Sequence, residues 1–259
     1  MSQAYFVINS NDRNKALYSN PADYRVVSTN YNFSAKDIAG LAGTEFSMKF
    51  DIPNINARNG KMIIDDGVSS YPIVIDDGFY DEAALAGLVQ TQLVAALGAG
   101  QFCNWNSLKQ RFVILTNVPI KITDLTGLSR DLADVMGFIK EGDLNITNIG
   151  GSSDLVYTRN IYLKSNTLHK NKTLQDQSTS PILTDLLMAI PVYQPGADTS
   201  KPQIISYQVT EPKRIHYNKG DSITSFDMQL LDDQGEPLYN PDTGDNSWYY
   251  HASILAYKY

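Results

Sequence analysis

Residues 45–52 read EFSMKFDI, and the alternation within them decides the fold class. Phe46, Met48 and Phe50 stand at every second position, with polar residues between them. Because successive side chains of a strand point to opposite faces, this spacing predicts a strand that is buried on one face and solvated on the other.

Similar strands are expected along both halves of the chain. In residues 222–231, SITSFDMQLL, Phe226, Met228 and Leu230 alternate with polar residues, and DDQGEPL supplies the turn that ends the run. Further strands are expected at residues 24–30, 61–65, 71–76, 111–117, 119–123, 155–165, 183–192, 203–210 and 248–259. About ten short strands joined by polar loops predict an all-β fold, an antiparallel single jelly-roll sandwich.

The period changes in the middle of the chain, where residues 81–98 read DEAALAGLVQTQLVAALG. Asp81 stands where an N-cap belongs and Gly98 where a helix stops, so we expect a helix between them. The apolar residues that fall on one face at helical spacing are Leu85, Leu88, Val89, Leu93, Ala96 and Leu97.

A second, shorter helix is expected at residues 129–138, capped by Ser129 and closed by Gly137. Residues 142–153 are rich in Gly, Ser and Asn, which favours a long turn. The jelly-roll domain, residues 23–259, is therefore expected to carry a small α/β insertion with one or two helices, at about residues 79–150.

Residues 1–22 are expected to form an extended N-terminal arm. A short apolar patch, Tyr5 to Ile8, is followed by turn-forming residues with little to bury. Two interpretations stay open: a strap that becomes ordered on a neighbouring molecule, or a terminus that frays or adds a strand to its own sheet.

Length and charge limit the possible functions. A chain of 259 residues is long enough for one large core. Its net charge of −7, without a basic stripe, argues against a protein that wraps nucleic acid, because binding a polyanion requires clustered Lys and Arg. A single cysteine, Cys103, excludes an intrachain disulfide and is expected to be a buried, unreactive thiol.

No targeting or membrane segment is recognisable in the sequence. The N-terminus, MSQAYFVINSNDRNK, lacks the apolar core of a signal peptide. No apolar run approaches the roughly 18 residues that span a bilayer. We therefore expect a protein that is made in a cytoplasm, is not secreted by a signal peptide and does not span a membrane.

An acidic motif is repeated in residues 62–81, MIIDDGVSSYPIVIDDGFYD, where Asp-Asp-Gly occurs at 65–67 and 76–78. A helix-loop-helix calcium site needs oxygen ligands at alternating positions that end in a bidentate Glu, and neither copy continues in that way. The motif is instead typical of strand ends that lead into turns. Divalent cation binding at these turns stays open.

The chain offers no recognisable catalytic arrangement. His169, His216 and His251 lie far apart and accompany no Ser or Cys elbow, and one cysteine gives no zinc-ligand spacing. Asp232 and Asp233 are adjacent, and adjacent residues of a strand cannot both address one substrate. We therefore assign no catalytic, cofactor-binding or metal residue, and expect neither a cofactor nor an enzyme.

Several short motifs follow one another in a particular order: FVINSNDRN, NPADYRVV, a strand ending in DIPNIN, IDDGFYDEAALAGLVQTQL and VMGF. In this order the chain resembles the minor capsid and penton proteins of virophages, polinton-like viruses and giant viruses. The C-terminal ITSFDMQLLDDQGEPL is similar to the closing strands of the same proteins. The matching positions are Asn9, Ser10, Arg13, Asp23, Tyr24, Gly78, Tyr80, Met136, Gly137 and Phe138, with Met136 replacing the usual Leu.

The resemblance implies a penton, a structural protein of the virion. A single jelly roll would assemble as a homopentamer at the fivefold vertices of an icosahedral capsid, among copies of a double-jelly-roll major capsid protein. In that case the arm supplies the expected contacts between subunits: Tyr5, Phe6, Ile8 and Arg13.

Two other functions compete with this one. A carbohydrate- or receptor-binding β-sandwich, such as a spike or fibre component, is favoured by the many aromatic residues and the Asp-Gly turns. A hydrolase on a β scaffold is disfavoured because no nucleophile and base are recognisable.

Overall fold

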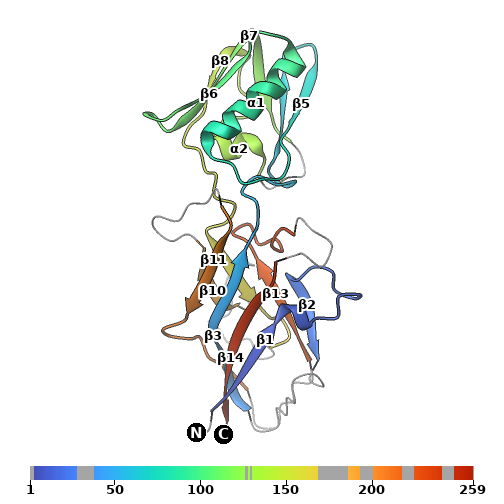
Figure 1. Cartoon of the computed structure of the whole chain (residues 1–259), viewed down its shortest axis with the longest axis vertical. Coiled ribbons are helices and arrows are strands. Elements are labelled where there is room, and N and C mark those ends of the chain that lie inside the picture. Colours follow the sequence, from blue (N-terminus) through green and yellow to red (C-terminus); the bar gives the residue numbers. More distant parts are fainter. Residues whose placement is uncertain are drawn as a thin grey trace. The chain divides into compact units, whose positions relative to one another are not determined.

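The computed structural model describes residues 3–27, 38–125, 128, 130–168, 186–192, 201–217, 225–240 and 248–258. The chain forms two compact units (Figure 1). The second unit is Pro53–Tyr157 with the short segment Asp198–Lys201, and the remaining chain forms the first. The insertion expected at about residues 79–150 lies within the second unit.

Two antiparallel sheets make up the first unit (Figure 1). Sheet A has the order β1-β14-β3-β11, with β12 also paired to β3, and sheet B has the order β10-β9-β13-β2. The strands of sheet A are β1 (Gln3–Asn9), β3 (Ile38–Phe50), β11 (Gln203–Gln208), β12 (Ile215–His216) and β14 (Tyr250–Lys258). Those of sheet B are β2 (Asp23–Val27), β9 (Asn160–Lys164), β10 (Leu186–Pro191) and β13 (Ser225–Leu231).

The central strand β3 contains the alternating stretch of residues 45–52. Phe46, Met48 and Phe50 are buried, whereas Glu45 and Lys49 are exposed, which confirms the predicted one-sided strand. The strand begins seven residues before the predicted start, at residue 38. Residues 38–43 are small or apolar and all buried, so they show no alternation for a pattern search to find.

An aromatic cluster joins the two sheets. The ring of Tyr250 in β14 stacks on Phe46 at a centroid distance of 5.4 Å and meets Tyr24 of β2 at 6.2 Å. All three side chains are at most 2% exposed. Close to this cluster in sequence, a Cβ on Gly43 would lie 2.7 Å from Cγ of Met188 in β10, so glycine allows the sheets to approach.

These contacts pack sheet A face to face against sheet B, as in a sandwich. The all-β jelly roll predicted from the alternating strands is therefore confirmed. The strand predicted at residues 24–30 is β2, of which residues 28–30 lie outside the described residues.

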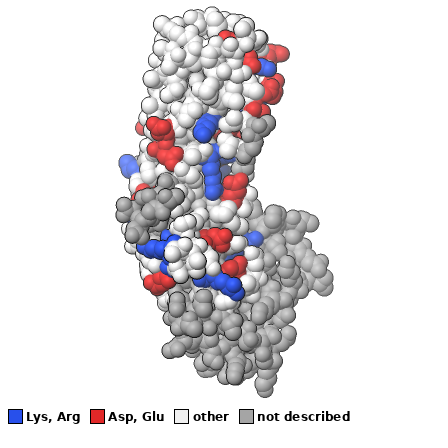
Figure 2. Space-filling view, turned by 90° about the vertical axis from the view of Figure 1, so that its right-hand side faces the viewer, with Lys and Arg blue, Asp and Glu red and all other residues white. Residues whose placement is uncertain are grey.

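The second unit is a sheet covered by a helix. Its sheet has the order β5-β4-β7-β6, with β8 also paired to β7, and α1 lies across one face (Figure 1). Figure 2 shows one face of the unit, at the top of the view, where charged side chains gather at the margin of a largely uncharged surface. Its elements are β4 (Lys61–Asp65), β5 (Ser70–Val74), α1 (Glu82–Leu97), β6 (Phe102–Asn106), β7 (Arg111–Thr123), α2 (Leu132–Met136) and β8 (Asn145–Ile149).

Both predicted helices are present. Asp81 caps α1 by accepting a hydrogen bond from the Ala84 N–H at 2.7 Å, and Gly98 ends it with φ of 86°. The buried face of α1 is Leu85, Ala86, Val89 and Leu93, whereas Leu88 is 38% exposed. The N-cap of α2 is Asp131 rather than Ser129, which lies outside the described residues.

One expectation for the second unit is confirmed with different bounds, and another was wrong. Residues 111–117 and 119–123 belong to one strand, β7, whose register shifts between Leu115 and Ile120. Residues 145–149, expected to lie in a long turn, form β8. The polar sequence of β8 gives no apolar alternation, and its strand form comes from backbone pairing with β7.

The Phe46 side chain should contribute strongly to the stability of the first unit. We expect Phe46→Ala to lower the free energy of unfolding by about 3–5 kcal/mol, because it leaves a cavity beside Tyr250. Tyr249→Ala removes an aromatic ring that is 40% exposed and is the matched control, with an expected change below about 1 kcal/mol. If chemical denaturation showed an equal loss of unfolding free energy for the two variants, the central role of Phe46 in the core would be contradicted.

Cys103 should be unreactive in the folded protein. Its side chain is 3% exposed, and burial raises the pKa of the thiol to about 12, so the nucleophilic thiolate is scarce at neutral pH. We expect iodoacetamide to modify Cys103 only after denaturation, as measured by mass spectrometry. In a Leu108→Cys variant the new thiol replaces a side chain that is 96% exposed and should react at once in the native state.

Candidate assembly surface

The expected arm contributes a strand to sheet A. Residues 3–9 form β1, which pairs with β14 along its whole length, from Gln3 opposite Tyr257 to Asn9 opposite His251. Ile8 is 1% exposed and Phe6 is half-buried, whereas Tyr5 is 65% exposed. Of these predicted contact residues, Tyr5 presents the most surface to a neighbouring molecule.

Arg13 organises the loop that follows β1. After a short 3-10 helix, η1 (Ser10–Asp12), its guanidinium donates hydrogen bonds to the backbone carbonyls of Ser10, Tyr18 and Ser19 at 2.9–3.0 Å. The side chain is buried, which a charged group tolerates only when it is hydrogen-bonded. Arg13 therefore fixes the loop of its own chain and lies away from the exposed face of β1.

The outward face of sheet A combines apolar and polar side chains in rows. One row across the strands is Val7, Ser253, Glu45 and Gln208, and the next is Asn9, His251, Ser47 and Ser206. Val7 on β1 is 57% exposed, and Ile204 on β11, at the other edge of sheet A, is 82% exposed. We call this surface, together with Tyr5 and Tyr249, the outer face of sheet A.

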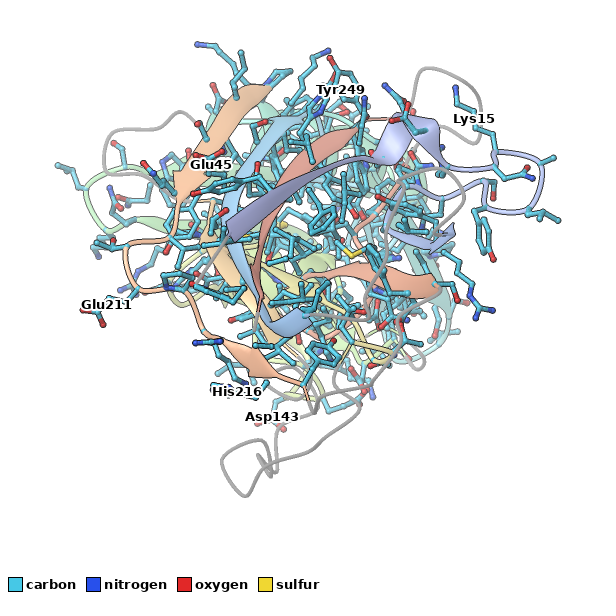
Figure 3. All side chains as sticks on the ribbon, turned by 90° about the horizontal axis from the view of Figure 1, so that it is seen from below. Lys15, Glu45, Asp143, Glu211, His216 and Tyr249 are labelled. Atoms are coloured by element: carbon cyan, nitrogen blue, oxygen red, sulfur yellow. The ribbon has the colours of Figure 1, made fainter. Side chains whose placement is uncertain are left out.

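A shallow groove of about 340 Å³ lies on the outer face of sheet A. Tyr249 meets the ring of His251 edge-on at 5.6 Å, and the Ser253 hydroxyl donates to Glu45 at 3.2 Å. Figure 3 shows Glu45 and Tyr249 directed away from the interior of the sandwich. The residues that line the groove are Glu45, Phe46, Ser47, Ser206, Tyr207, Gln208, His251 and Ser253.

The first Asp-Asp-Gly copy forms a tight turn between β4 and β5. Oδ1 of Asp66 accepts backbone hydrogen bonds from Val68 and Ser69 at 2.9 and 2.7 Å, and Gly67 takes φ of 86°. The bonds from Ser69 and Val68 lower the pKa of Asp66. Asp65 Oδ1 accepts from the N–H of Gly67. The carboxylates thus act as turn formers, as the sequence predicts.

The second copy follows β5, and its glycine makes a bridge. Gly78 and Ile55 exchange backbone hydrogen bonds of 2.9 and 3.2 Å, which closes the strand end before α1. Within the described part of the chain, no group of three His, Cys, Asp or Glu side chains could hold a metal ion.

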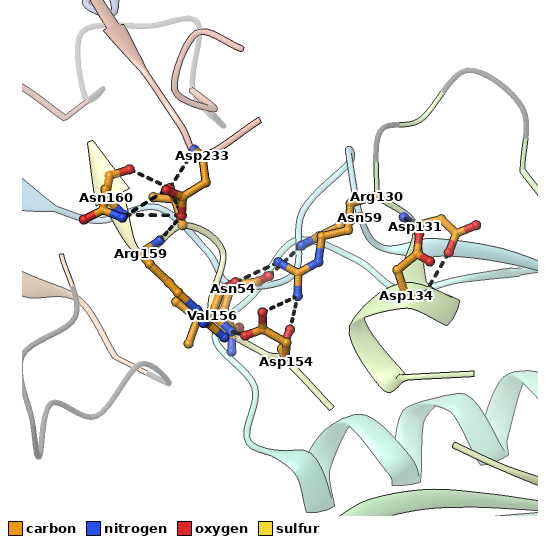
Figure 4. A network of polar contacts seen from close by, with 11 residues as sticks. Asn54, Asn59, Arg130, Asp131, Asp134, Asp154, Val156, Arg159, Asn160 and Asp233 are labelled. Atoms are coloured by element: carbon orange, nitrogen blue, oxygen red, sulfur yellow. Dashed lines mark hydrogen bonds and ion pairs between the residues drawn. The ribbon is translucent and has the colours of Figure 1, made fainter. Parts of the chain in front are cut away.

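Asp232 and Asp233 are engaged in different local structures. Asp232 Oδ1 accepts from the backbone N–H of Gln234 and Glu236, within the turn after β13. Asp233 accepts from the Thr158 hydroxyl, from the backbone N–H of Arg159 and Asn160, and from the Asn160 amide (Figure 4). The two carboxylates stabilise neighbouring loops of the first unit and do not converge.

The two described histidines, His216 and His251, lie on different strands and do not converge. His216 lies exposed in β12 and His251 is half-buried in β14, and His169 lies outside the described residues. No helix among the described residues is long and apolar enough to cross a membrane.

A partly buried ion-pair network surrounds the start of α2 in the second unit. The Lys140 ammonium lies 2.9 Å from Asp124 and Asp134 and 3.3 Å from Asp131. Burial raises the pKa of Asp131, whereas Lys140 keeps its charge because hydrogen bonds from its ammonium offset burial. Nearby, Arg130 donates to the backbone carbonyls of Asp154 and Val156 (Figure 4).

Asp227 stabilises the loop after β9 in the first unit. Its carboxylate accepts from the Ser165 hydroxyl and from the backbone N–H groups of Asn166 and Thr167, and the Thr167 hydroxyl adds a bond of 2.6 Å. Burial by itself raises the pKa of Asp227, but these hydrogen bonds outweigh it and hold the pKa below the usual value of 3.8.

The lowered pKa of Asp227 makes its contribution pH-dependent. A carboxyl group whose pKa is lower in the folded state stabilises the fold at pH values above its unfolded-state pKa. This contribution to the free energy of unfolding is lost as the pH falls through the folded-state pKa. The difference in free energy of unfolding between the wild type and Asp227→Asn should therefore be largest at neutral pH and shrink below about pH 3.8. Denaturant titrations across this range measure it, with Glu211→Gln, at an exposed position, as a control expected to show no such trend.

Sequence reasoning did not find most of the outer face of sheet A. Val7, Ile204 and Tyr249 each alternate with a buried neighbour, namely Ile8, Ile205 and Tyr250. The alternation was visible in the sequence, but which side of each strand faces the core depends on how the sheets pack.

Comparison with known proteins supports the fold. The structure is similar to the crystal structure of the mavirus penton protein, with a TM-score of 0.54 and 15% sequence identity over 100% of both chains. A chain in the cryo-EM structure of the Sputnik virophage matches with a TM-score of 0.47 and 14% identity, over 100% of this chain and 98% of that one. No protein-family model and no curated protein sequence matches the chain. The predicted resemblance is therefore confirmed at the level of the fold, and the chain has the fold of the mavirus penton protein.

Proposed function

We propose that the chain is a structural capsid protein of a virus, and specifically a penton that forms homopentamers at the fivefold vertices of an icosahedral capsid. The full-length similarity of its fold to the mavirus penton protein carries this proposal. Its place is then the virion, beside copies of a double-jelly-roll major capsid protein.

The outer face of sheet A is the proposed contact between subunits. A ring of five copies joins two different patches of neighbouring subunits, so both patches are exposed on every free copy, and the outer face of sheet A is proposed as one of them. Tyr5, Val7 and Ile204 supply exposed apolar surface there, and Tyr249 adds an aromatic side chain of the kind enriched at interface centres. Stable interfaces bury more than about 1,000 Å².

The four residues predicted from the arm take different parts in this proposal. Tyr5 touches the neighbouring subunit, because it is the most exposed of the four. Phe6 is half-buried and points to the other side of β1, as Ile8 does. Ile8 and Arg13 act indirectly, since Ile8 anchors β1 in the core and Arg13 fixes the following loop.

Charges placed on β1 should prevent ring formation. We expect the wild type to form particles of five 28.8 kDa chains by light scattering, and Tyr5→Glu with Val7→Lys to weaken each interface by at least about 2 kcal/mol. The control, Val68→Lys with Leu108→Glu, alters side chains of the second unit that are 91% and 96% exposed and should leave the rings intact.

Thermal unfolding checks that both double variants fold. Electron microscopy of virus particles provides the second measurement, with density for the chain expected at the vertices. A wild-type monomer that is absent from particles would contradict the proposal. Binding of that monomer to glycans through the groove on sheet A would favour the carbohydrate-binding alternative instead.

A further inference from the structure

Strand β8 forms an open edge of the sheet in the second unit. It pairs with β7 on one side, and no other described strand pairs with it. Its residues, NITNI, include no charge and no proline. Edge strands of soluble proteins are normally protected by lysine, proline or a bulge, because their free backbone groups pair with any strand that approaches. The pairing of β8 with β7 is irregular between Leu115 and Ile120, so the regular part of this edge is residues 147–149.

One of the other edges of the same sheet has such protection. Strand β5 carries Pro72 at its centre, opposite Ile63 of β4. Proline has no N–H to offer to a further strand and is confined to sheet edges for that reason. The β5 and β8 edges therefore differ in chemistry. The third edge, β6, is uncharged like β8, but its Cys103 N–H already donates to the Gln90 side chain of α1 at 3.2 Å.

The backbone pairing shows which groups of β8 face outward. Gly150, directly after β8, donates its N–H to the Phe112 carbonyl at 2.9 Å. Because hydrogen bonding alternates along an antiparallel pair, the backbone groups of Asn148 also face β7, and those of Thr147 and Ile149 face the open edge.

A groove of about 210 Å³ lies along this edge. Ile139, which is 81% exposed, and Ile149, which is 54% exposed, supply apolar surface beside Phe138 and Thr147. A strand that paired with β8 would direct every second side chain toward this surface. The groove therefore fits apolar side chains spaced two residues apart.

The charges around the groove favour a basic occupant. Asp143 lines the groove, is exposed and has no ion-pair or hydrogen-bond partner for its carboxylate among the described residues. Residues 53–157 contain 12 Asp and Glu but 7 Lys and Arg, a net charge of −5. An incoming segment with Lys or Arg next to its apolar residues would complement this field.

We propose that β8 is a docking site for an extended segment of a partner protein, which adds to the sheet as a further antiparallel or parallel strand. Its backbone pairs with Thr147 and Ile149, its alternate apolar side chains enter the groove, and a Lys or Arg lies against Asp143. This site is separate from the surface proposed for ring assembly.

A synthetic peptide can test the site directly. The probe is a capped peptide of alternating isoleucine and threonine residues, flanked by lysines. The matched control peptide has the same sequence, but alternate backbone amides are N-methylated. We expect fluorescence anisotropy to show binding of the first peptide and at least about tenfold weaker binding of the second, because methylation blocks strand pairing. Amide hydrogen exchange should slow at Thr147 and Ile149 when the first peptide binds.

Two variants locate the interaction on β8. Thr147→Pro removes an outward N–H without touching the bonds to β7 and should weaken peptide binding about tenfold. Thr147→Val keeps that N–H and should bind as the wild type does. Asp143→Asn should weaken binding several-fold and reduce its dependence on salt.

Three results would overturn the proposal. The first is that the wild type does not bind the peptide. The second is that the N-methylated peptide binds as tightly as the unmethylated one. Both results come from the wild-type protein, so they do not depend on the folding of a variant. The third is a wild-type dimer that Thr147→Pro abolishes, since a second copy would then occupy the edge. The variant Tyr5→Glu with Val7→Lys should still bind the peptide, so failure of ring assembly and failure of this site are distinguishable.

Discussion

The burial of Tyr250 between Phe46 and Tyr24 is the contact on which the jelly roll depends. One side chain of β14 joins its own sheet to the opposite one. Because side chains alternate along a strand, fixing Tyr250 inward forces Tyr249 and His251 outward. The same packing that stabilises the core therefore creates the surface that we propose for assembly.

In the second unit, too, alternation along a strand decides which side chains are buried and which face outward. In β7, Phe112 and Ile114 are buried in the core beneath α1, so Val113 and Leu115 face outward. The sheet ends at β8, where the hydrogen-bonding capacity of the backbone is left available on one side. In both units the features that we propose for binding are surfaces and edges of sheets rather than enclosed pockets.

The acidic side chains serve mainly to shape loops. Asp66 forms a turn, Asp131 caps a helix, and Asp227 and Asp233 hold loops of the first unit through several hydrogen bonds each. Since a carboxylate that accepts backbone N–H bonds is committed to that structure, these groups are poorly placed to transform a substrate. Much of the acidic composition is thus explained by local folding.

The sequence by itself determined the elements with local signals: the half-buried strand at Phe46, the helix between Asp81 and Gly98, and the turn at Asp66. In each case the cause of the local structure lies in neighbouring residues: apolar and polar residues alternate, a side chain caps the helix, or a glycine accepts positive φ. Tertiary structure alone decided that the buried residues 38–43 extend β3, that β8 is a strand, and that Ile8 is covered while Tyr5 is exposed. These outcomes depend on pairing with strands distant in the chain, and no short window of sequence contains the partner.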